Sequence, residues 1–203
     1  MDTIRKYLFS ISYRLFRFLV KHIVFIYQKI FNRDKDLESI VEFGDKNLTW
    51  INNNLGSLAF NFAIPRGLDT ELFDLKFKSP LVAASFKSDE NLLDIWMKLG
   101  LGGSTYKTVM KSERIGNPRP RLQQIRLERE QCLVNALGLP GSGINLFIKE
   151  LLASSLWAYN RPLGISIGGE NVDEYVSNFN EIEKTLNGTV PVSYTHLTLP
   201  TKA

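Results

Sequence analysis

Apolar residues recur at helical spacing through the first 32 residues, and basic residues interrupt them. The apolar positions include Ile4, Leu8, Ile11, Leu15, Phe18, Leu19 and Ile26. Arginines and lysines divide the segment, so no uncharged run approaches the roughly 20 residues that a spanning helix needs. The pattern predicts an amphipathic helix that lies on a membrane, its apolar face in the headgroup boundary and its cations reaching towards anionic lipid. The alternative is a helix or hairpin packed on its own domain.

A second pattern, alternating strands and helices, begins near residue 72. Residues 33–71 read as a linker leading into it, polar at 32–36 and turn-rich at 47–54. Beyond the linker we expect a hairpin at 72–78, strands at 80–84, 104–110, 132–136 and 162–167, and helices at 90–99, 144–157 and 171–186. Such alternation predicts an α/β fold with parallel strands and right-handed crossovers. Ligands in such folds bind at the carboxyl ends of the strands, which here are small or polar: Ala84-Ser85, Lys107-Thr108, Asn135 and Ser166.

Composition narrows the classes of function. The chain has 203 residues, 44% hydrophobic content and a net charge of +4, and many of its basic residues lie in the first 35, which argues against a nucleic-acid surface. The single cysteine, Cys132, excludes an intrachain disulfide and fits a reducing compartment. We therefore expect a cytoplasmic protein, peripheral on the cytoplasmic membrane face. Because His22 and His196 fall outside the predicted domain, we expect no metal site and no His-activated nucleophile.

The stretch from Thr105 to Arg121 carries the clearest candidate chemistry. It places Lys107 near the end of a strand, before a loop that is stiffened by Pro118 and Pro120. Such an arrangement suits a cation held beside a flat anionic ligand. The alternative is a solvated lysine on an edge strand.

Four segments in order resemble the dihydroorotate dehydrogenase family, the FMN-containing (β/α)8 barrels of pyrimidine synthesis. They are LKFKSPLVAAS at 75–85, YKTVMKSERIGNPRPR at 106–121, VNALGLPGSG at 134–143 and PLGISIGG at 162–169. The resemblance covers roughly residues 72–186. It implies a TIM barrel of which residues 72–191 supply the N-terminal half, preceded by the amphipathic helical extension.

The resemblance also implies the cofactor contacts. Ala84 and Ser85 match small residues that pack on the flavin. Lys107 matches the lysine that class 1 members place between the flavin and orotate, where a cation stabilises the anionic reduced flavin. Thr108 matches a residue that hydrogen-bonds the flavin, and Ser166 matches a polar position near it.

The substrate contacts follow from the third segment. Asn135 matches the asparagine that bonds the pyrimidine ring. Leu137, Gly138 and Leu139 match the segment whose backbone amides meet the substrate carboxylate, where glycine permits close approach.

Three departures from the family pattern leave the subclass open. Phe86 stands where glycine is usual and could crowd the flavin, and Gly141 stands where class 1 members commonly have a substrate-binding asparagine. Lys87 lies near the class 2 lysine but needs a one-residue gap to match it, so Lys107 is preferred. The amino-terminal helix, by contrast, resembles the class 2 arrangement that approaches quinone in the bilayer.

The last residues, 192–203, resemble a translated sequencing adapter, so we expect a non-native tail. The catalytic base, a Cys or Ser on a later loop, is then expected in a missing C-terminal half, together with the loops that hold the FMN phosphate. The sequence thus predicts a fragment of a flavin-dependent enzyme that oxidises dihydroorotate to orotate, itself inactive, with quinone and the membrane surface as partners. The alternatives are a diverged dihydropyrimidine dehydrogenase-like flavoprotein and a non-catalytic membrane-surface protein with a relic barrel.

Overall fold

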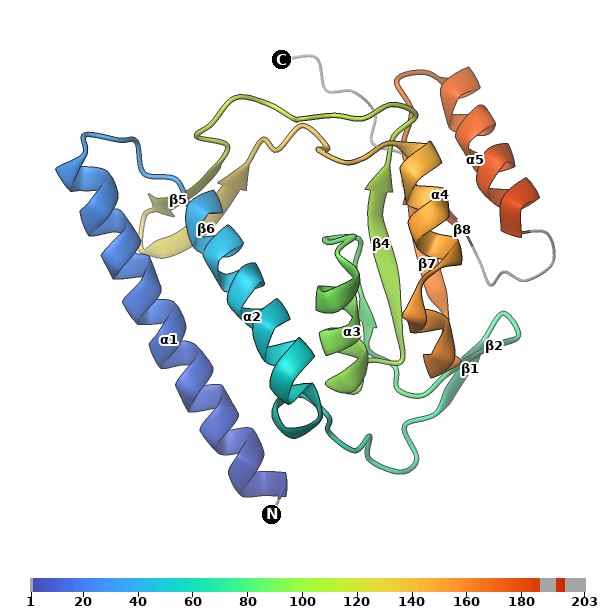
Figure 1. The fold of residues 1–203 in the computed structure, drawn as a ribbon, viewed down its shortest axis with the longest axis horizontal. Coiled ribbons are helices and arrows are strands. Elements are labelled where there is room, and N and C mark those ends of the chain that lie inside the picture. The colour runs from blue at the N-terminus through green and yellow to red at the C-terminus, as the bar shows by residue number, and fades with distance from the viewer. Residues whose placement is uncertain (1, 187–192, 196–203) are drawn as a thin grey trace. The chain divides into compact units, whose positions relative to one another are not determined.

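The computed structural model describes residues 2–186 and 193–195 (Figure 1). The chain forms two compact units. Unit 1 consists of Met1–Ala59 with Gly116–Gly138, and unit 2 consists of Phe60–Ile115 with Leu139–Ala203. Each unit is described separately below.

Unit 1 is a pair of helices with a β-hairpin. Helix α1 spans Asp2–Ile30 and helix α2 spans Glu38–Ala59, and the two run side by side (Figure 1). Strands β5 (Leu122–Leu127) and β6 (Glu130–Asn135) pair antiparallel. The predicted amino-terminal helix is therefore confirmed as a helix, and no helix among the described residues has the length and hydropathy needed to cross a bilayer.

Helix α2 corrects the prediction of a turn-rich linker at 47–54. That prediction relied on the asparagines, which usually favour turns because their side chains compete for backbone hydrogen bonds. In α2 the amides of Asn47 and Asn54 instead donate to carbonyls one turn earlier, those of Phe43 and Trp50, at 2.7 and 2.8 Å. The side-chain amides thus bond within the helix instead of ending it.

Unit 2 is built on a parallel sheet, as predicted. Its strand order is β3 (Val82–Ala83), β4 (Gly103–Val109), β7 (Leu163–Ile167) and β8 (Ser193–Thr195). The helices are α3 (Glu90–Lys98), α4 (Ile144–Leu152) and α5 (Val172–Leu186), with a 3-10 turn, η1, at Ser155–Tyr159. A separate hairpin pairs β1 (Thr70–Leu72) with β2 (Leu75–Phe77).

The helix starts in unit 2 follow from their capping residues. The Asp89 carboxylate accepts from the Leu92 amide at 3.1 Å, and the Asn171 side chain accepts from the Glu174 amide at 2.9 Å. Both are the N-cap bonds expected for these residue types. Each helix is therefore fixed at the point where the chain leaves the sheet.

The core of unit 2 lies between the sheet and its helices. Tyr106 on β4 meets the Phe147 ring of α4 edge-on, with ring centroids 5.4 Å apart. The other fully or nearly fully buried members are Leu93, Met97, Val109, Ile144, Leu151, Leu156, Leu163, Ile165, Ile167, Ile182 and Leu186. Burial of these side chains is the main stabilisation of unit 2.

Two predicted strand assignments differ from the structure. The apolar run at 132–136 belongs to the antiparallel β5–β6 hairpin of unit 1, so Asn135 does not end a strand of the parallel sheet. No strand was predicted in the tail at 192–203, but Ser193–Thr195 pair with β7 as β8. Residues 187–192 and 196–203, including His196, lie outside the described residues, and the adapter origin of the tail stays a prediction.

Candidate functional site

The carboxyl edge of the parallel sheet in unit 2 brings together most of the predicted cofactor residues. The Lys107 amide donates to the Lys87 carbonyl at 3.0 Å, which joins β4 to the segment after β3. Strand β4 pairs with β7 as far as Val109 and Ile167, with a register shift after Tyr106. Ala84, Ser85, Lys107, Thr108 and Ser166 therefore share this edge.

Lys107 holds the segment that the sequence predicts to bind substrate. Its half-buried side chain donates from Nζ to the Pro140 carbonyl at 2.9 Å. Pro140 directly follows Leu139, whose φ is +52°. The ammonium group therefore lies beside the turn at 139–141.

Thr108 and Ser166 meet each other directly. Their hydroxyl oxygens are 2.9 Å apart, and Ser166 is fully buried. Their predicted flavin contacts are not tested by this geometry. The pair nonetheless places two hydroxyls on neighbouring strands at the ligand edge of the sheet.

A buried residue at this edge, Asn178, was not predicted from the sequence. It is fully buried on α5, and its Nδ2 donates to the Gly168 carbonyl at 2.8 Å. A Cβ at Gly168 would lie 2.5 Å from the Met110 sulfur, so any larger residue there would require the Met110 side chain to move. The signal was present in the sequence, because Asn178 lies three residues after Tyr175 and four before Ile182, on the apolar face of the predicted helix.

The side chains of the segment after β3 are more exposed to solvent than the predicted flavin contact implies. Ala84 is exposed and Ser85 is half-buried. Phe86 is 59% exposed, and the Lys87 ammonium lies 5.7 Å from the centroid of its ring. The Phe86 ring thus stands at the surface and does not fill the core.

The turn at 139–143 is fixed by backbone contacts. Arg114 and Gly141 exchange two backbone hydrogen bonds, of 2.8 and 2.9 Å. Gly143 has φ +79°, and a Cβ there would lie 2.8 Å from the Glu113 amide nitrogen. Gly141 has open space around its Cβ position. The two glycines therefore have different tolerance for a side chain.

We expect Gly143→Ala to destabilise unit 2 by about 1–3 kcal/mol, because alanine is strained at positive φ and its Cβ meets backbone. Gly141→Ala is the matched control and should change the free energy of unfolding by less than about 0.5 kcal/mol. Urea denaturation followed by tryptophan fluorescence measures both. Equal effects of the two substitutions on the free energy of unfolding would show that the backbone at Gly143 does not require glycine.

The remaining predicted substrate residues belong to unit 1. Asn135 is exposed at the end of β6, in register with Leu122. The Leu137 carbonyl accepts from the Asn117 amide at 3.0 Å, and Gly138 has φ +74°, with a Cβ position 2.8 Å from the Asn117 nitrogen. The structure thus divides the predicted site residues between two units, and the substrate roles of Asn135, Leu137 and Gly138 stay predictions.

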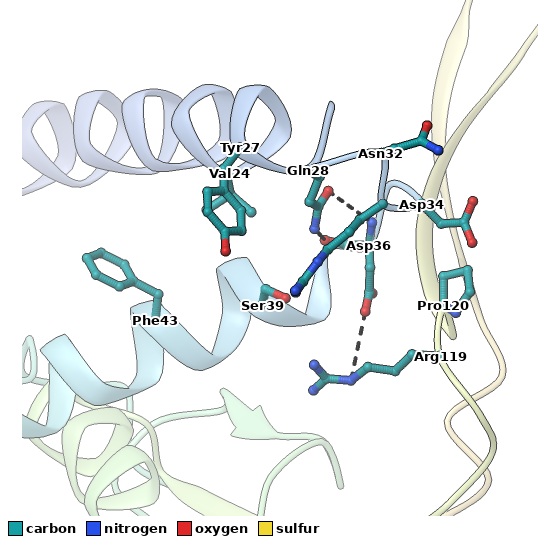
Figure 2. Close-up of a pocket in the computed structure, with 11 residues that line it drawn as sticks. Val24, Tyr27, Gln28, Asn32, Asp34, Asp36, Ser39, Phe43, Arg119 and Pro120 are labelled. Atoms are coloured by element: carbon teal, nitrogen blue, oxygen red, sulfur yellow. Dashed lines mark hydrogen bonds and ion pairs between the residues drawn. The ribbon is translucent and has the colours of Figure 1, made fainter. Parts of the chain in front are cut away.

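Unit 1 contains a cavity of about 590 Å³ between α1, α2 and the proline-rich loop (Figure 2). Its lining combines aromatic and aliphatic side chains with amide, hydroxyl and charged groups. The lining residues are Val24, Tyr27, Gln28, Asn32, Arg33, Asp34, Asp36, Ser39, Phe43, Arg119 and Pro120. On one wall Gln28 and Asp36 exchange hydrogen bonds of 2.8 and 3.2 Å.

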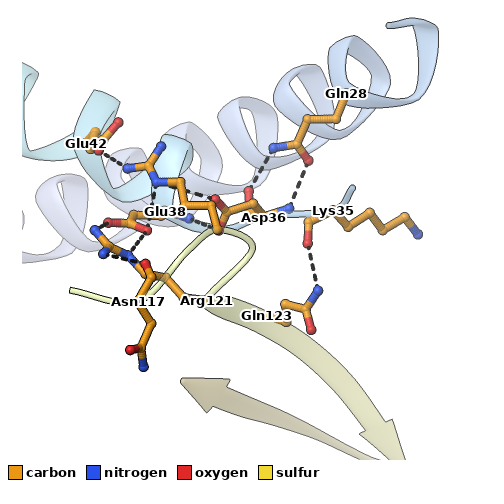
Figure 3. A network of polar contacts seen from close by, with 9 residues as sticks. Gln28, Lys35, Asp36, Glu38, Glu42, Asn117, Arg121 and Gln123 are labelled. Carbon is orange, nitrogen blue, oxygen red and sulfur yellow. Dashed lines mark hydrogen bonds and ion pairs between the residues drawn. The ribbon is translucent and has the colours of Figure 1, made fainter. Parts of the chain in front are cut away.

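An ion-pair network fixes the proline-rich loop to the start of α2 (Figure 3). Arg121 binds Glu38 through two hydrogen bonds of 2.8 and 2.7 Å, and Arg119 binds Glu38 at 2.9 Å and also contacts Glu42. The hydrogen bond from Arg121 is the largest cause that lowers the pKa of Glu38 from 4.5 to about 2. The sequence predicted a stiff loop here but missed its acidic partners, which lie in the segment taken for a linker.

We expect Glu38→Gln to destabilise unit 1 by about 1–2 kcal/mol at pH 7, because two guanidinium groups lose their shared carboxylate. The pKa of Glu38 is lower in the folded than in the unfolded state, so its stabilisation is fully present above pH 4.5 and is lost as the pH falls towards 2. Thermal unfolding between pH 7 and pH 2.5 tests both statements. The difference in melting temperature between wild type and Glu38→Gln should become smaller below pH 4.5. A difference that does not change with pH would contradict the role of the Glu38 carboxylate.

The described residues contain no group of three or more His, Cys, Asp or Glu side chains able to hold a metal ion. The groups gathered at the carboxyl edge in unit 2 are an ammonium group, two hydroxyls and backbone amides. These groups suit the polar edge of a planar heterocycle.

The fold and this edge define an α/β protein whose predicted cofactor residues lie at the carboxyl ends of parallel strands. A family model described as dihydroorotate dehydrogenase matches residues 67–193. That match covers more than half of the chain, which therefore belongs to the dihydroorotate dehydrogenase family.

Individual relatives agree with this assignment. The chain is 32% identical over 131 residues to a dihydroorotate dehydrogenase (quinone) of Gloeobacter violaceus, covering 61% of this chain and 35% of the relative. It is 31% identical over 127 residues to a protein of the same description from Rhodopseudomonas palustris, covering 60% and 34%. The chain thus spans about a third of the length of these relatives.

Among solved structures, DHODH of Eimeria tenella in complex with ferulenol matches with a TM-score of 0.62 and 20% identity, over 78% of this chain and 44% of that one. The ligand-free form from the same organism matches with a TM-score of 0.55 and 19% identity. At this level of identity the likeness concerns the fold, and it supports the α/β architecture.

Proposed function

We propose that this chain is part of an FMN-dependent enzyme that oxidises dihydroorotate to orotate in pyrimidine synthesis. The observation that carries the proposal is Lys107, placed at the carboxyl edge of a parallel sheet within a chain of this family. An ammonium group there stabilises negative charge that develops on a bound heterocycle. The proton acceptor, a Cys or Ser, belongs in this proposal to sequence beyond this chain.

We propose that unit 2 supplies the first half of a (β/α)8 barrel. The parallel order β3-β4-β7 supports this, because consecutive strands of such a barrel are neighbours. The remaining strands of the barrel would follow these. The carboxyl edge described above would then form part of the top face, where active sites of these barrels lie.

The residues at this edge fit the polar side of a flavin ring. Lys107 and Thr108 would bind ring oxygen and nitrogen atoms, Ala84 and Ser85 would pack on the ring, and Ser166 would support Thr108 through their hydroxyl contact. The flavin, when bound, supplies the hydride acceptor for the substrate carbon. Phe86 stands at the surface with a ring that is largely exposed, so its ring is not buried among the residues of this edge.

We further propose quinone as the electron acceptor and a membrane surface as its source. The relatives described as quinone enzymes support this proposal, as does the cavity of unit 1, where Tyr27 and Phe43 face polar groups. Such a lining suits a ring that carries carbonyl oxygens. On α1 the apolar side chains Ile4, Leu8 and Leu15 are 57–67% exposed, which fits a helix lying in the headgroup boundary.

The membrane proposal predicts that Leu8→Glu with Leu15→Glu lowers flotation with anionic liposomes by at least about fivefold, because two exposed apolar contacts become repulsive. The control is Asn53→Glu, an exposed position on α2. Flotation of the double variant at the wild-type level would count against α1 as a membrane-binding helix.

The enzymatic proposal is tested by expressing the full-length gene and assaying the completed protein. Orotate formation with quinone as acceptor supports it, and no turnover with quinone, fumarate or a nicotinamide cofactor contradicts it. Flavin reduction by dihydrouracil but not by dihydroorotate would favour the dihydropyrimidine dehydrogenase-like alternative. A completed protein without flavin absorbance would favour the non-catalytic alternative.

A further inference from the structure

We propose that Arg114 is a positioning residue for Lys107, acting through the turn at 139–141. The proposal rests on the proposed function for its consequence, since Lys107 is the cation of the proposed site. The Lys107 ammonium donates to a backbone carbonyl, that of Pro140, at 2.9 Å. The direction in which the ammonium points therefore depends on the position of the turn at 139–141.

The turn is attached to Arg114 one residue further on. Gly141 accepts from the Arg114 amide and donates to the Arg114 carbonyl, at 2.8 and 2.9 Å. Gly141 has no side chain, and the space around its Cβ position is open. Its place therefore depends on the backbone pair with Arg114, and adjacent residues are only about 3.8 Å apart between Cα atoms.

The side chain of Arg114 ties this arrangement to the β7–α5 loop. Its guanidinium forms an ion pair with Glu170, which follows Gly168-Gly169 at the end of β7. The Glu170 amide in turn donates to the Glu174 carboxylate on α5 at 2.8 Å. The residues around Arg114 are exposed, Ile115 to 86%, so packing contributes little to holding this segment.

A chain of contacts thus leads from α5 through Glu170, Arg114 and Gly141 to Pro140 and Lys107. Loss of the Arg114–Glu170 ion pair would leave the backbone hydrogen bonds between Arg114 and Gly141 in place. The residues around Arg114 could then shift, and the Pro140 carbonyl would move with them. Lys107 would then sample more directions and become more accessible to solvent. A preorganised cation is worth more in a binding site than a mobile one.

The test measures the accessibility of Lys107 in the chain as it stands. Brief acylation by acetic anhydride followed by peptide mass spectrometry gives the labelling rate of Lys107, with the exposed Lys149 of α4 as internal reference. Glu170→Gln and Arg114→Gln should each raise the Lys107 rate about two- to fivefold, the range an exposed ion pair can supply. Arg114→Lys should stay close to wild type because it keeps the charge.

The matched control is Asp69→Asn, which removes another surface ion pair of unit 2, that with Lys78 at 3.5 Å. It should leave the Lys107 rate unchanged. A wild-type rate in either Glu170→Gln or Arg114→Gln, or an equal rise in Asp69→Asn, overturns the positioning role. Unchanged circular dichroism in all variants excludes unfolding as the cause of a rise.

A second arm separates this inference from the proposed function. Orotate with FMN should protect Lys107 of the full-length enzyme, in which the proposed barrel is complete, from acylation if Lys107 contacts these ligands. Absence of protection counts against the proposed site. The response to Glu170→Gln still decides the positioning role, because it is measured without any ligand.

Discussion

Completed enzyme carrying Lys107→Gln is expected to oxidise dihydroorotate about 10²–10³-fold more slowly than wild type, the usual effect of removing one preorganised electrostatic contact. Lys107 Nζ lies 2.9 Å from the Pro140 carbonyl oxygen; glutamine is a shorter side chain that still carries an N–H donor but no positive charge. The loss should appear mainly in kcat, because the charge on the ring system develops during hydride transfer. Steady-state assays of orotate formation measure it.

The control for this variant is Lys98→Gln, which removes a lysine that pairs with Asp94 on α3 at 2.6 Å. Both residues lie on the helix, away from the carboxyl edge of the sheet. Lys98→Gln should therefore keep kcat within about twofold, since the pair does not touch the proposed site. A Lys107→Gln enzyme with wild-type kcat would remove Lys107 from the proposed site.

The largest effect on stability is expected from Ile167→Ala, at about 2–5 kcal/mol, because the side chain is fully buried and its removal leaves a cavity in the core. Ile167 pairs with Val109 of β4 and with Thr195 of β8, so it lies in the middle of the sheet. Urea denaturation followed by tryptophan fluorescence measures the change in the free energy of unfolding.

Ile115→Ala removes the same atoms at a position that is 86% exposed, and it should cost less than about 0.5 kcal/mol. Comparable losses for the two variants would mean that Ile167 does not lie in the core. A smaller slope of the denaturation curve for Ile167→Ala would indicate that the units unfold separately.

The elements of unit 2 could be predicted because their local signals agree with their packing. Asp89 and Asn171 cap helices that begin at or next to the predicted starts, residues 90 and 171, and the strands β4 and β7 bury the apolar runs that defined them. Lys107 was also placed correctly at a strand end. In each case, a few neighbouring residues carry the information.

The elements of unit 1 were harder to predict because their decisive contacts are distant in sequence. Glu38 is fixed by Arg121, 83 residues later in the sequence, and the residues adjacent to Glu38 do not predict that pairing. The run at 132–136 is apolar like a core strand, yet it pairs with β5 in a hairpin. An apolar run shorter than six residues does not specify its partner strand.

The backbone pair between Arg114 and Gly141 has a consequence for the history and engineering of the chain. Within unit 2 this pair joins the residues just before and just after segment 116–138. The two ends of that segment are therefore held close together by backbone hydrogen bonds. A segment attached in this way can change in length or sequence at small entropic cost, since lengthening a loop whose ends already meet adds little to the free energy. The hairpin can therefore diversify, or be exchanged for a short turn, while the sheet that carries Lys107 keeps its geometry.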